Sequence, residues 1–450
     1  MRSRTKMDAL SQLNRIPHLL SEVLGGMSIP ALLEAEKVSQ QWKHIISTHN
    51  IWKEKWQSSM VSPTWKLLAV RLEHTNPALL AGTKESREGA TYREACASVQ
   101  QDIGGMERCR MKTEEVCNLS RAMIGAGIRA NERNVYIGDG TRVIVVNRWT
   151  RQVVPGDSKH HFPFWIQDFQ LNDRYIFVQS NNGSIVIKDL SSYEQIQEVS
   201  DFFDDYPFPT GFRVAGDILI NSMLSIDLKS LMVVMRRWDP SAVQFGPAID
   251  RAVVIDDFEM NLWLFSSQIY LHRNLLVADA YSKDGSKRMI KIIDLDSDDQ
   301  LVRQKTFDVT RISSDGIKQE CHSGVIIVEA GSKCAEHCQL AEWNVEEDTI
   351  RPVCSLPSKP NSFDAFGSFV LDEGLRETVN FRRLPIDDWR SCKNSAVKAH
   401  LMAHTLPRAG GFNQRRNRFY FDGVQFFWIS GTKLNLIEFC NWKNDCEGIM

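Results

Sequence analysis

The sequence predicts a chain of α+β class in two parts, an all-α N-terminal region followed by an all-β region. Apolar residues recur at helical intervals of three and four until about residue 110, and at the strand interval of two from about residue 116. The 450 residues are enough for more than one domain. We expect an N-terminal tail over residues 1–15, a compact helical module over 16–60, a helical linker over 61–115 and a repetitive β-region over 116–450. The tail is too short for a separate domain, since domains rarely have fewer than about 50 residues.

The compact module begins with a helix after Pro17, a residue that suits the first turn of a helix. Ser28 followed by Ile29-Pro30 repeats this signal and predicts a second helix. A third apolar set leads to Trp52 and Trp56, which are four residues apart and therefore share a helix face. So few residues cannot bury this much apolar surface alone. The module therefore docks either on the β-region of its own chain or on a partner helix or groove.

The order of residues in this module resembles the F-box, the module that binds the Skp adaptor of a cullin–RING ubiquitin ligase. The residues that carry the resemblance, and that it implies for adaptor binding, are Ile16, Pro17, Leu19, Leu20, Val23, Leu24, Leu32, Leu33, Val38, Trp42, Ile51 and Trp52. The spacing of Val38, Trp42 and Trp52 is the most specific part. Two features depart from the family pattern: Ile16-Pro17 stands in place of Leu-Pro, and Gly25-Gly26 lie late in the first helix, where each glycine costs about 1 kcal/mol relative to alanine.

Two further helices are expected in the linker. Ser62 to Leu72 reads as one helix, and residues 91–110 read as a longer one, separated by a loop rich in Gly, Pro and Ser. Tyr92-Arg93 and Gln100-Gln101-Asp102-Ile103 resemble the linker helix of F-box proteins with WD repeats, particularly the β-transducin-repeat-containing receptors. The resemblance implies a rigid spacer between the adaptor and the substrate surface. An ordinary packing helix is the alternative.

The β-region contains eight pairs of short strand-like runs, each pair joined by Gly, Asp, Asn or Ser. The pairs are 134–138 with 142–147, 174–180 with 184–190, 217–222 with 224–228, 252–256 with 261–266, 275–281 with 289–295, 324–330 with 340–345, 366–372 with 379–384, and 418–423 with 434–439. Their average spacing of roughly 40 residues is typical of propeller blades, so an all-β propeller of seven or eight blades is favoured over a pair of β-sandwiches.

Several of these runs end in Asp or Asn at one equivalent place: Asn147, Asp189, Asp227, Asp294 and Asn344. The Trp-Asp pair of WD repeats usually occupies that place, and Trp343-Asn344 comes nearest to it. The β-region therefore resembles a strongly divergent WD-repeat propeller.

Composition excludes several functional classes. With 54 basic and 56 acidic residues the net charge is −2, so no overall field favours nucleic acid or a membrane surface. The basic N-terminus lacks the apolar core of a signal peptide, and no run reaches the roughly 18 to 20 apolar residues of a membrane helix. Ten cysteines spread singly through a long chain suit a reducing compartment. We therefore expect a soluble protein of the cytoplasm or nucleus.

Candidate chemical sites are few, and we expect no metal, cofactor or catalytic residue. Cys334, His337 and Cys338 form a compact group, but a structural zinc site needs a fourth ligand and no second pair is evident. His400 and His404 have the spacing of a metal pair without the glutamate of the zinc-protease motif, and we expect them on a solvated loop or helical turn.

Two charged stretches are candidates for binding a protein target. Asp201, Asp204 and Asp205 alternate with aromatic residues, and Arg415, Arg416 and Arg418 form a basic group. Arginine pairs with phosphate in bidentate fashion, and receptors of the resembled family read phosphorylated segments with arginines, so the basic group is a weak candidate for substrate binding. Solvated turns are the alternative for both stretches.

Taken together, the resemblance implies a non-catalytic substrate receptor of an SCF (Skp–cullin–F-box) ubiquitin ligase. The F-box would bind the Skp adaptor and through it the cullin and RING subunits, while the propeller would capture a protein target, with or without phosphorylation, for ubiquitylation. Two alternatives remain open: a propeller scaffold without a ligase role, and an enzyme with a central propeller pocket.

Overall fold

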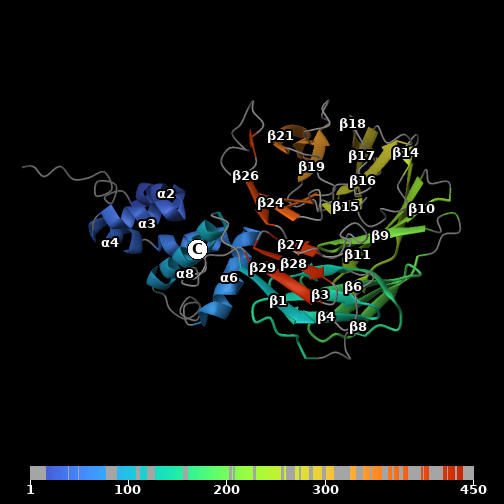
Figure 1. The fold of residues 1–450 in the computed structure, drawn as a ribbon, viewed down its shortest axis with the longest axis horizontal. Coiled ribbons are helices and arrows are strands. Elements are labelled where there is room, and N and C mark those ends of the chain that lie inside the picture. The colour runs from blue at the N-terminus through green and yellow to red at the C-terminus, as the bar shows by residue number, and fades with distance from the viewer. Residues whose placement is uncertain are drawn as a thin grey trace, which may run out of the picture.

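A computed structural model defines the fold of the chain (Figure 1). The residues that the structure describes are 17–38, 40–48, 50–77, 89–107, 112–118, 127–155, 161–201, 205, 208–226, 230–254, 258–259, 269–272, 275–282, 287–295, 301–308, 325–330, 338–344, 347–356, 363–366, 369–373, 379–383, 397–398, 400–404, 419–422, 424–430 and 433–438.

The N-terminal part of the described chain is helical, as predicted. We refer to its helices together as the helical unit: α2 (Pro17–Gly26), α3 (Ile29–Val38), α4 (Gln40–Thr48), α5 (Ile51–Ser59), α6 (Pro63–Thr75) and α8 (Gly89–Glu107). Two helix starts follow directly from hydroxyl side chains. Ser28 Oγ accepts a hydrogen bond from the N–H of Ala31, and Ser62 Oγ accepts one from the N–H of Trp65, and each bond satisfies a donor of the first turn that has no partner within the helix.

The helices share one apolar core, which explains why they form a unit. Leu32 of α3, Trp52 of α5, Leu68 of α6 and Val99 of α8 are fully or almost fully buried in the same cluster. Helix α8 packs on α3, α4, α5 and α6. The linker helix is therefore a packed member of the helical unit.

After the helices the described strands pair into seven sheets of three to five strands, and neighbouring strands are antiparallel except for one short parallel pair. The strands follow in sheet order: β2 (Ile128–Ala130), β3 (Asn134–Asp139) and β4 (Arg142–Asn147); β5 (Ile166–Leu171), β6 (Tyr175–Ser180), β7 (Ile185–Asp189) and β8 (Gln195–Val199); β9 (Phe208–Ala215), β10 (Ile218–Leu224), β11 (Ser230–Asp239), β12 (Gln244–Phe245) and β13 (Ile249–Val254); β14 (Phe258–Glu259), β15 (Ile269–His272), β16 (Leu275–Ser282), β17 (Lys287–Asp294) and β18 (Leu301–Asp308); β19 (Val325–Ala330), β20 (Cys338–Asn344), β21 (Thr349–Leu356) and β25 (Val397–Lys398); β22 (Phe363–Phe366), β23 (Phe369–Glu373), β24 (Val379–Arg383) and β26 (His400–His404); β1 (Lys112–Asn118), β27 (Phe419–Phe421), β28 (Gln425–Ser430) and β29 (Lys433–Glu438).

The last of these sheets joins the two ends of the β-region. β1, which follows the helical unit, pairs antiparallel with β29, near the end of the chain, and β29 continues the sheet to β28 and β27. Figure 1 shows the sheets following one another around the domain, with β29 returning to the side of β1. Successive antiparallel sheets closed by the first and last strands define a β-propeller, and the closure removes the exposed edges that an open sheet would present.

A turn of one kind recurs after a strand in four of the sheets. An Asn or Asp side chain accepts hydrogen bonds from backbone N–H groups two or three residues ahead, and the residue four positions ahead adopts a positive φ between 55° and 61°. The four pairs are Asn147 with Arg151, Asp189 with Tyr193, Asp239 with Val243, and Asn344 with Asp348. The prediction of an Asn or Asp at one equivalent place is thus confirmed for Asn147, Asp189 and Asn344. It was wrong for the third repeat, where Asp239 makes the turn and Asp227 lies outside the described residues.

Three of the eight predicted strand pairs need correction. Residues 224–228 are not the second strand of the third pair: β10 continues to Leu224, the N–H of Ser225 donates to Ser230 O in the turn, and β11 follows. The first strand of the fourth pair corresponds to β13, which is paired with β11 of the preceding sheet, and residues 261–266 lie outside the described residues. In the eighth pair β28 separates β27 from β29. The sequence patterns did not predict β28, because its apolar run lacks the alternation expected of a strand that is buried on one face only.

Candidate functional site

The candidate site is the set of residues that resembles an F-box, and the structure divides it by exposure. Leu24, Leu32, Ile51 and Trp52 are at most 1% exposed and lie in the core of the helical unit. Leu33 and Trp42 are half-buried against the same core. These side chains hold the helices together, and a partner cannot reach the four buried ones without opening the unit.

Three members of the set point outward instead. Leu19 and Val23 of α2 are 38% and 45% exposed, and Val38 at the end of α3 is 65% exposed. Leu19 and Val23 are four residues apart, so they lie on one face of α2, whereas Leu24 on the same helix faces the core. The described helices therefore present apolar side chains to solvent on the module where the sequence predicts a docking surface.

Other members lie outside the described residues or have side chains that are not described. Ile16 lies outside them, and Pro17 and Leu20 belong to α2 without described side chains. Arg415, Arg416 and Arg418 lie outside the described residues, as do Cys334 and His337.

A buried polar network links three helices of the helical unit. The indole N–H of Trp52 donates to one carboxylate oxygen of Glu36 at 3.0 Å, and Arg93 Nε donates to the other oxygen. Glu36 is 7% exposed, so this carboxylate joins α3, α5 and α8 inside the unit. Beside it, burial raises the pKa of the Cys96 thiol to about 12, with Lys55 acting in the opposite direction. Cys96 is thus a neutral core residue.

Apolar packing joins the helical unit to the propeller. Trp65, Leu68 and Leu72 of α6 belong to one buried cluster with Trp149 and with four propeller side chains of the closing sheet and the turn before β28, namely Val424, Phe426, Trp428 and Ile437. Trp149 also donates its indole N–H to Glu132 O at 2.8 Å, across the turn between β2 and β3. The helical unit therefore packs on the end of the propeller where these turns lie, and Figure 1 shows α6 and α8 beside β1 and β29.

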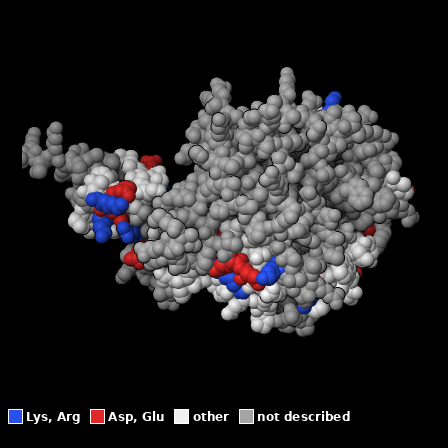
Figure 2. Space-filling view, viewed as in Figure 1, with Lys and Arg blue, Asp and Glu red and all other residues white. Residues whose placement is uncertain are grey.

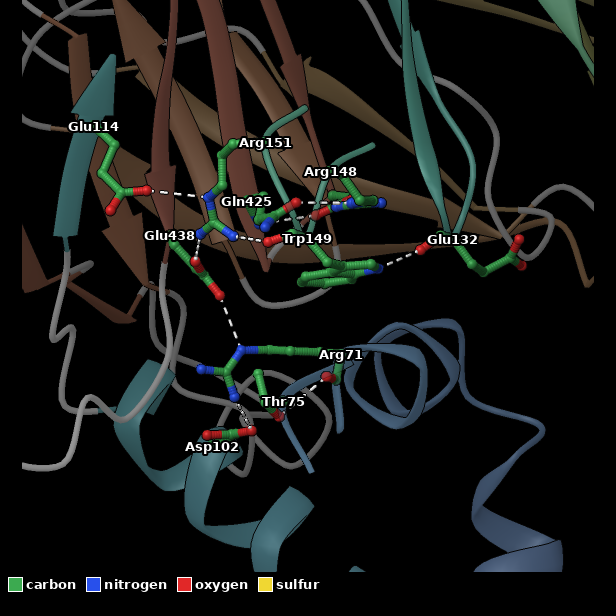
Figure 3. Close-up of polar contacts among 11 residues, drawn as sticks. Arg71, Thr75, Asp102, Glu114, Glu132, Arg148, Trp149, Arg151, Gln425 and Glu438 are labelled. Atoms are coloured by element: carbon green, nitrogen blue, oxygen red, sulfur yellow. Dashed lines mark hydrogen bonds and ion pairs between the residues drawn. The ribbon is translucent and has the colours of Figure 1, made fainter. Parts of the chain in front are cut away.

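A chain of alternating charges crosses the same junction, and we call its five residues the junction network (Figure 3). They are Asp102 of α8, Arg71 of α6, Glu438 of β29, Arg151 of the turn after β4, and Glu114 of β1. Arg71 Nη1 lies 2.7 Å from Asp102 Oδ2, Arg71 Nε lies 2.9 Å from Glu438 Oε1, and Arg151 Nε lies 3.0 Å from Glu114 Oε2. Arg151 Nη2 also donates to the second oxygen of Glu438.

A buried arginine ties the first sheet to the closing sheet beside this network. The Arg148 guanidinium donates to Asp422, to Gln425 Oε1 at 2.7 Å and to Asn131 O at 2.8 Å, and it lies over the rings of Trp149 and Phe427. Its side chain is fully buried. Buried charges that are paired and hydrogen-bonded in this way specify geometry, because each partner must stay in place.

Elsewhere the structure changes two expectations about charged residues. Asp201 does not form a solvated acidic surface, because its side chain is 5% exposed and is paired with Arg236, whose Nη2 lies 2.7 Å from Asp201 Oδ1. His400 and His404 lie in strand β26, paired with Arg383 and Val379, and not in a loop or helical turn. The alternation of His400, Met402 and His404 with Leu401 and Ala403 already has the period of a strand.

The described residues contain no group of three His, Cys, Asp or Glu side chains arranged to hold a metal ion. Among the described helices none is both long enough and apolar enough to cross a membrane. Figure 2 shows charged side chains of both signs next to one another, on the helical unit and again near β1 and β29. Neither place carries charge of a single sign in this view.

Sequence reasoning missed the junction network, although one signal was present. Leu434, Leu436 and Glu438 alternate along β29 and are all at most 2% exposed, so Glu438 lies on a buried face of its strand. A carboxylate at such a position requires a buried partner. The partners could not be found from the sequence, because Arg71 and Glu438 are 367 positions apart.

Comparison with known proteins supports the N-terminal assignment. The model of the F-box domain matches residues 13–54, which span α2 to the first turn of α5. The chain thus combines a helical N-terminal module with a β-propeller. It carries an F-box domain at its N-terminus.

The other two comparisons add little. No curated protein matches the chain. Similar solved structures include a chain of the Mitotic Checkpoint Complex (10% identity, 73% of this chain and 90% of that chain covered, TM-score 0.45), the WD40 repeats of RRP9 (13%, 73% and 97%, TM-score 0.42) and U3-55K (12%, 72% and 98%, TM-score 0.42). The propeller assignment rests on the strand pairing and its closure.

Proposed function

We propose that this chain is the substrate-recognition subunit of an SCF-type ubiquitin ligase. The observation that carries the proposal is the F-box match over residues 13–54, on a helical unit whose α2 exposes Leu19 and Val23. In the proposed complex these side chains and Val38 contact the Skp adaptor, and through the adaptor the chain joins the cullin and RING subunits. The buried members of the F-box set keep the contacting helices in register.

The chain would act by position and not by its own chemistry. A receptor that holds its target beside a partner's catalytic centre raises the effective concentration of the target and restricts its orientation. In the proposed complex, catalysis belongs to the partner subunits.

The propeller face opposite the helical unit is the proposed place for the target. In an antiparallel sheet the turn between β3 and β4 lies at the end opposite the turn between β2 and β3, which the helical unit approaches through Trp149. At that free end Trp165 is 49% exposed, and its ring lies beside Gly140 of the turn between β3 and β4. Ile226, in the turn after β10, is 63% exposed at the same end of its sheet. Aromatic and apolar side chains on turns are typical contact residues of protein interfaces.

Co-purification with a recombinant Skp adaptor tests the proposal. We expect the full chain to form a stable complex, and the double substitution Leu19→Asp and Val23→Asp to abolish it, because two carboxylates would be buried without partners at the contact. Ile226→Asp places the same change on the propeller and should leave adaptor binding unchanged. Should the wild-type chain fail to bind under conditions where a known F-box protein binds, the ligase role is wrong and the chain is an interaction scaffold.

A further inference from the structure

Glu438 occupies an unusual place between the two parts of the molecule. Its carboxylate is 2% exposed, and its two oxygens accept hydrogen bonds from different arginines, Arg71 of the helical unit and Arg151 of the propeller (Figure 3). Each arginine also forms an ion pair within its own part of the molecule. Arg71 pairs with Asp102 of α8, and Arg151 pairs with Glu114 of β1.

The arginine on the propeller side is also held by its backbone. Arg151 has a φ of 61°, in the recurrent turn that starts at Asn147, and its N–H donates to Asn147 O at 2.9 Å. Its guanidinium donates to Trp149 O as well. The same turn recurs in other sheets, where a residue other than arginine has the positive φ. The turn is therefore a feature of the propeller repeat, whereas the Arg151 side chain is specific to the junction.

Apolar packing alone does not fix the angle between the two parts. Burial of Trp65, Leu68 and Trp149 favours contact, but the hydrophobic effect has no directional preference. Charge-assisted hydrogen bonds to a guanidinium are directional. Another polar tie from α6 to the propeller, Glu73 with Arg133 at 3.0 Å, involves side chains that are 34% and 59% exposed, where an ion pair contributes little. The contacts of Glu438 are directional and shielded from solvent, so they restrain the angle between the two parts.

From this geometry we infer that Glu438 is a positioning residue: by accepting from both Arg71 and Arg151 it fixes the orientation of the helical unit on the propeller. The inference concerns the shape of the free chain. Its consequence for ubiquitylation rests on the proposed function, since the fixed orientation would set where a captured target lies relative to the adaptor.

The test measures a distance between the two parts in the full chain. Fluorophores are attached through noncanonical amino acids at Gln57 on α5 and Asn181 on the turn between β6 and β7, two exposed positions, so that the native cysteines stay unlabelled. Single-molecule energy transfer then gives the distribution of the distance at 20 °C. The chains compared are wild type, Glu438→Gln, Arg71→Gln and, as the matched control, Glu115→Gln. Glu115 lies on the closing sheet as well, but it pairs with Lys433 at the surface.

We expect Glu438→Gln and Arg71→Gln to shift or broaden the distribution beyond that of the wild type, and Glu115→Gln to leave it unchanged. Arg71→Gln is decisive if Glu438→Gln weakens the closing sheet, because it leaves the contact between Glu438 and Arg151 intact. A wild-type distribution for Arg71→Gln overturns the inference. The measurement needs no adaptor, so the inference can fail while adaptor binding succeeds, and it can hold while adaptor binding fails.

Discussion

Trp52 and Arg93 share the carboxylate of Glu36, so a single buried side chain links the F-box helices to the linker helix. Replacing Glu36 by Ala would leave the indole N–H of Trp52 buried without its acceptor. An unsatisfied buried donor costs about 1–3 kcal/mol, so we expect the opening free energy of α5 and α8 to fall by about that amount. Native-state hydrogen exchange of the two helices measures it.

The control for this prediction is Glu34→Ala, which removes the exposed ion pair with Lys37 on the same helix. Exposed pairs contribute about 0–1 kcal/mol, so exchange in this variant should stay close to wild type. Equal effects of the two substitutions would show that the shared carboxylate has no special role.

The second prediction concerns the buried pair of Arg148 and Asp422. Arg148→Met removes a fully buried guanidinium and leaves the Asp422 carboxylate without its charged partner, which typically costs about 3–5 kcal/mol. We expect the propeller to unfold at a lower urea concentration, and circular dichroism measures the midpoint of that unfolding. The double variant Arg148→Met with Asp422→Leu should recover part of the loss, because it removes both charges. A double variant less stable than Arg148→Met would contradict this reading of the pair.

Two glycines should respond in opposite directions to the same substitution. No atom lies within 4 Å of a Cβ built on Gly25 in α2, so Gly25→Ala should stabilise the helix by about 0.5–1 kcal/mol. Gly140 has a φ of +67°, a backbone conformation that side chains with a Cβ rarely adopt, so Gly140→Ala should destabilise the turn between β3 and β4. Thermal unfolding and hydrogen exchange of the two segments give the signs. A loss of stability in Gly25→Ala would overturn the first expectation.

The lowered pKa of Asp189 predicts that the stability of the folded chain falls at acidic pH. The hydrogen bond from the Ser191 hydroxyl lowers the pKa of Asp189 from 3.8 to about 2, helped by backbone N–H groups of Ser191 and Ser192 and opposed by burial. Because the folded state has the lower pKa, this contribution is fully present above the unfolded pKa of about 4 and is lost as the pH falls through about 2.

Asp189→Asn should therefore flatten the fall in melting temperature between pH 4 and 2, while keeping the turn. Asn147 shows that an amide oxygen accepts the same backbone hydrogen bonds in the equivalent turn. Asp173→Asn, an exposed change of the same charge, serves as control. Identical pH profiles of the two variants would count against the assignment.

The parts of the structure that could be predicted are those with a local physical cause. Ser28 and Ser62 announce helices because a hydroxyl accepts from the first turn, and runs such as 174–180 and 184–190 pair because their alternation puts apolar residues on a buried face. The third strand pair failed because Leu224, Ile226 and Leu228 alternate as a strand does, although Ile226 is exposed in a turn. Within the candidate site, helical spacing located Leu19 and Trp52, but it could not separate the exposed residue from the buried one. The burial of Trp52 depends in part on α8, which packs on α3, α4 and α5 from later in the chain.

The pairing of β1 with β29 has a consequence for the order in which the protein is made. The ribosome releases the helical unit and β1 well before the strand that completes their sheet, Lys433–Glu438, because that strand follows the other propeller strands in the chain. A product that ends before residue 433 lacks both the strand beside β1 and the carboxylate that Arg71 and Arg151 share. We therefore expect premature termination to leave the junction unassembled even when the F-box sequence is intact.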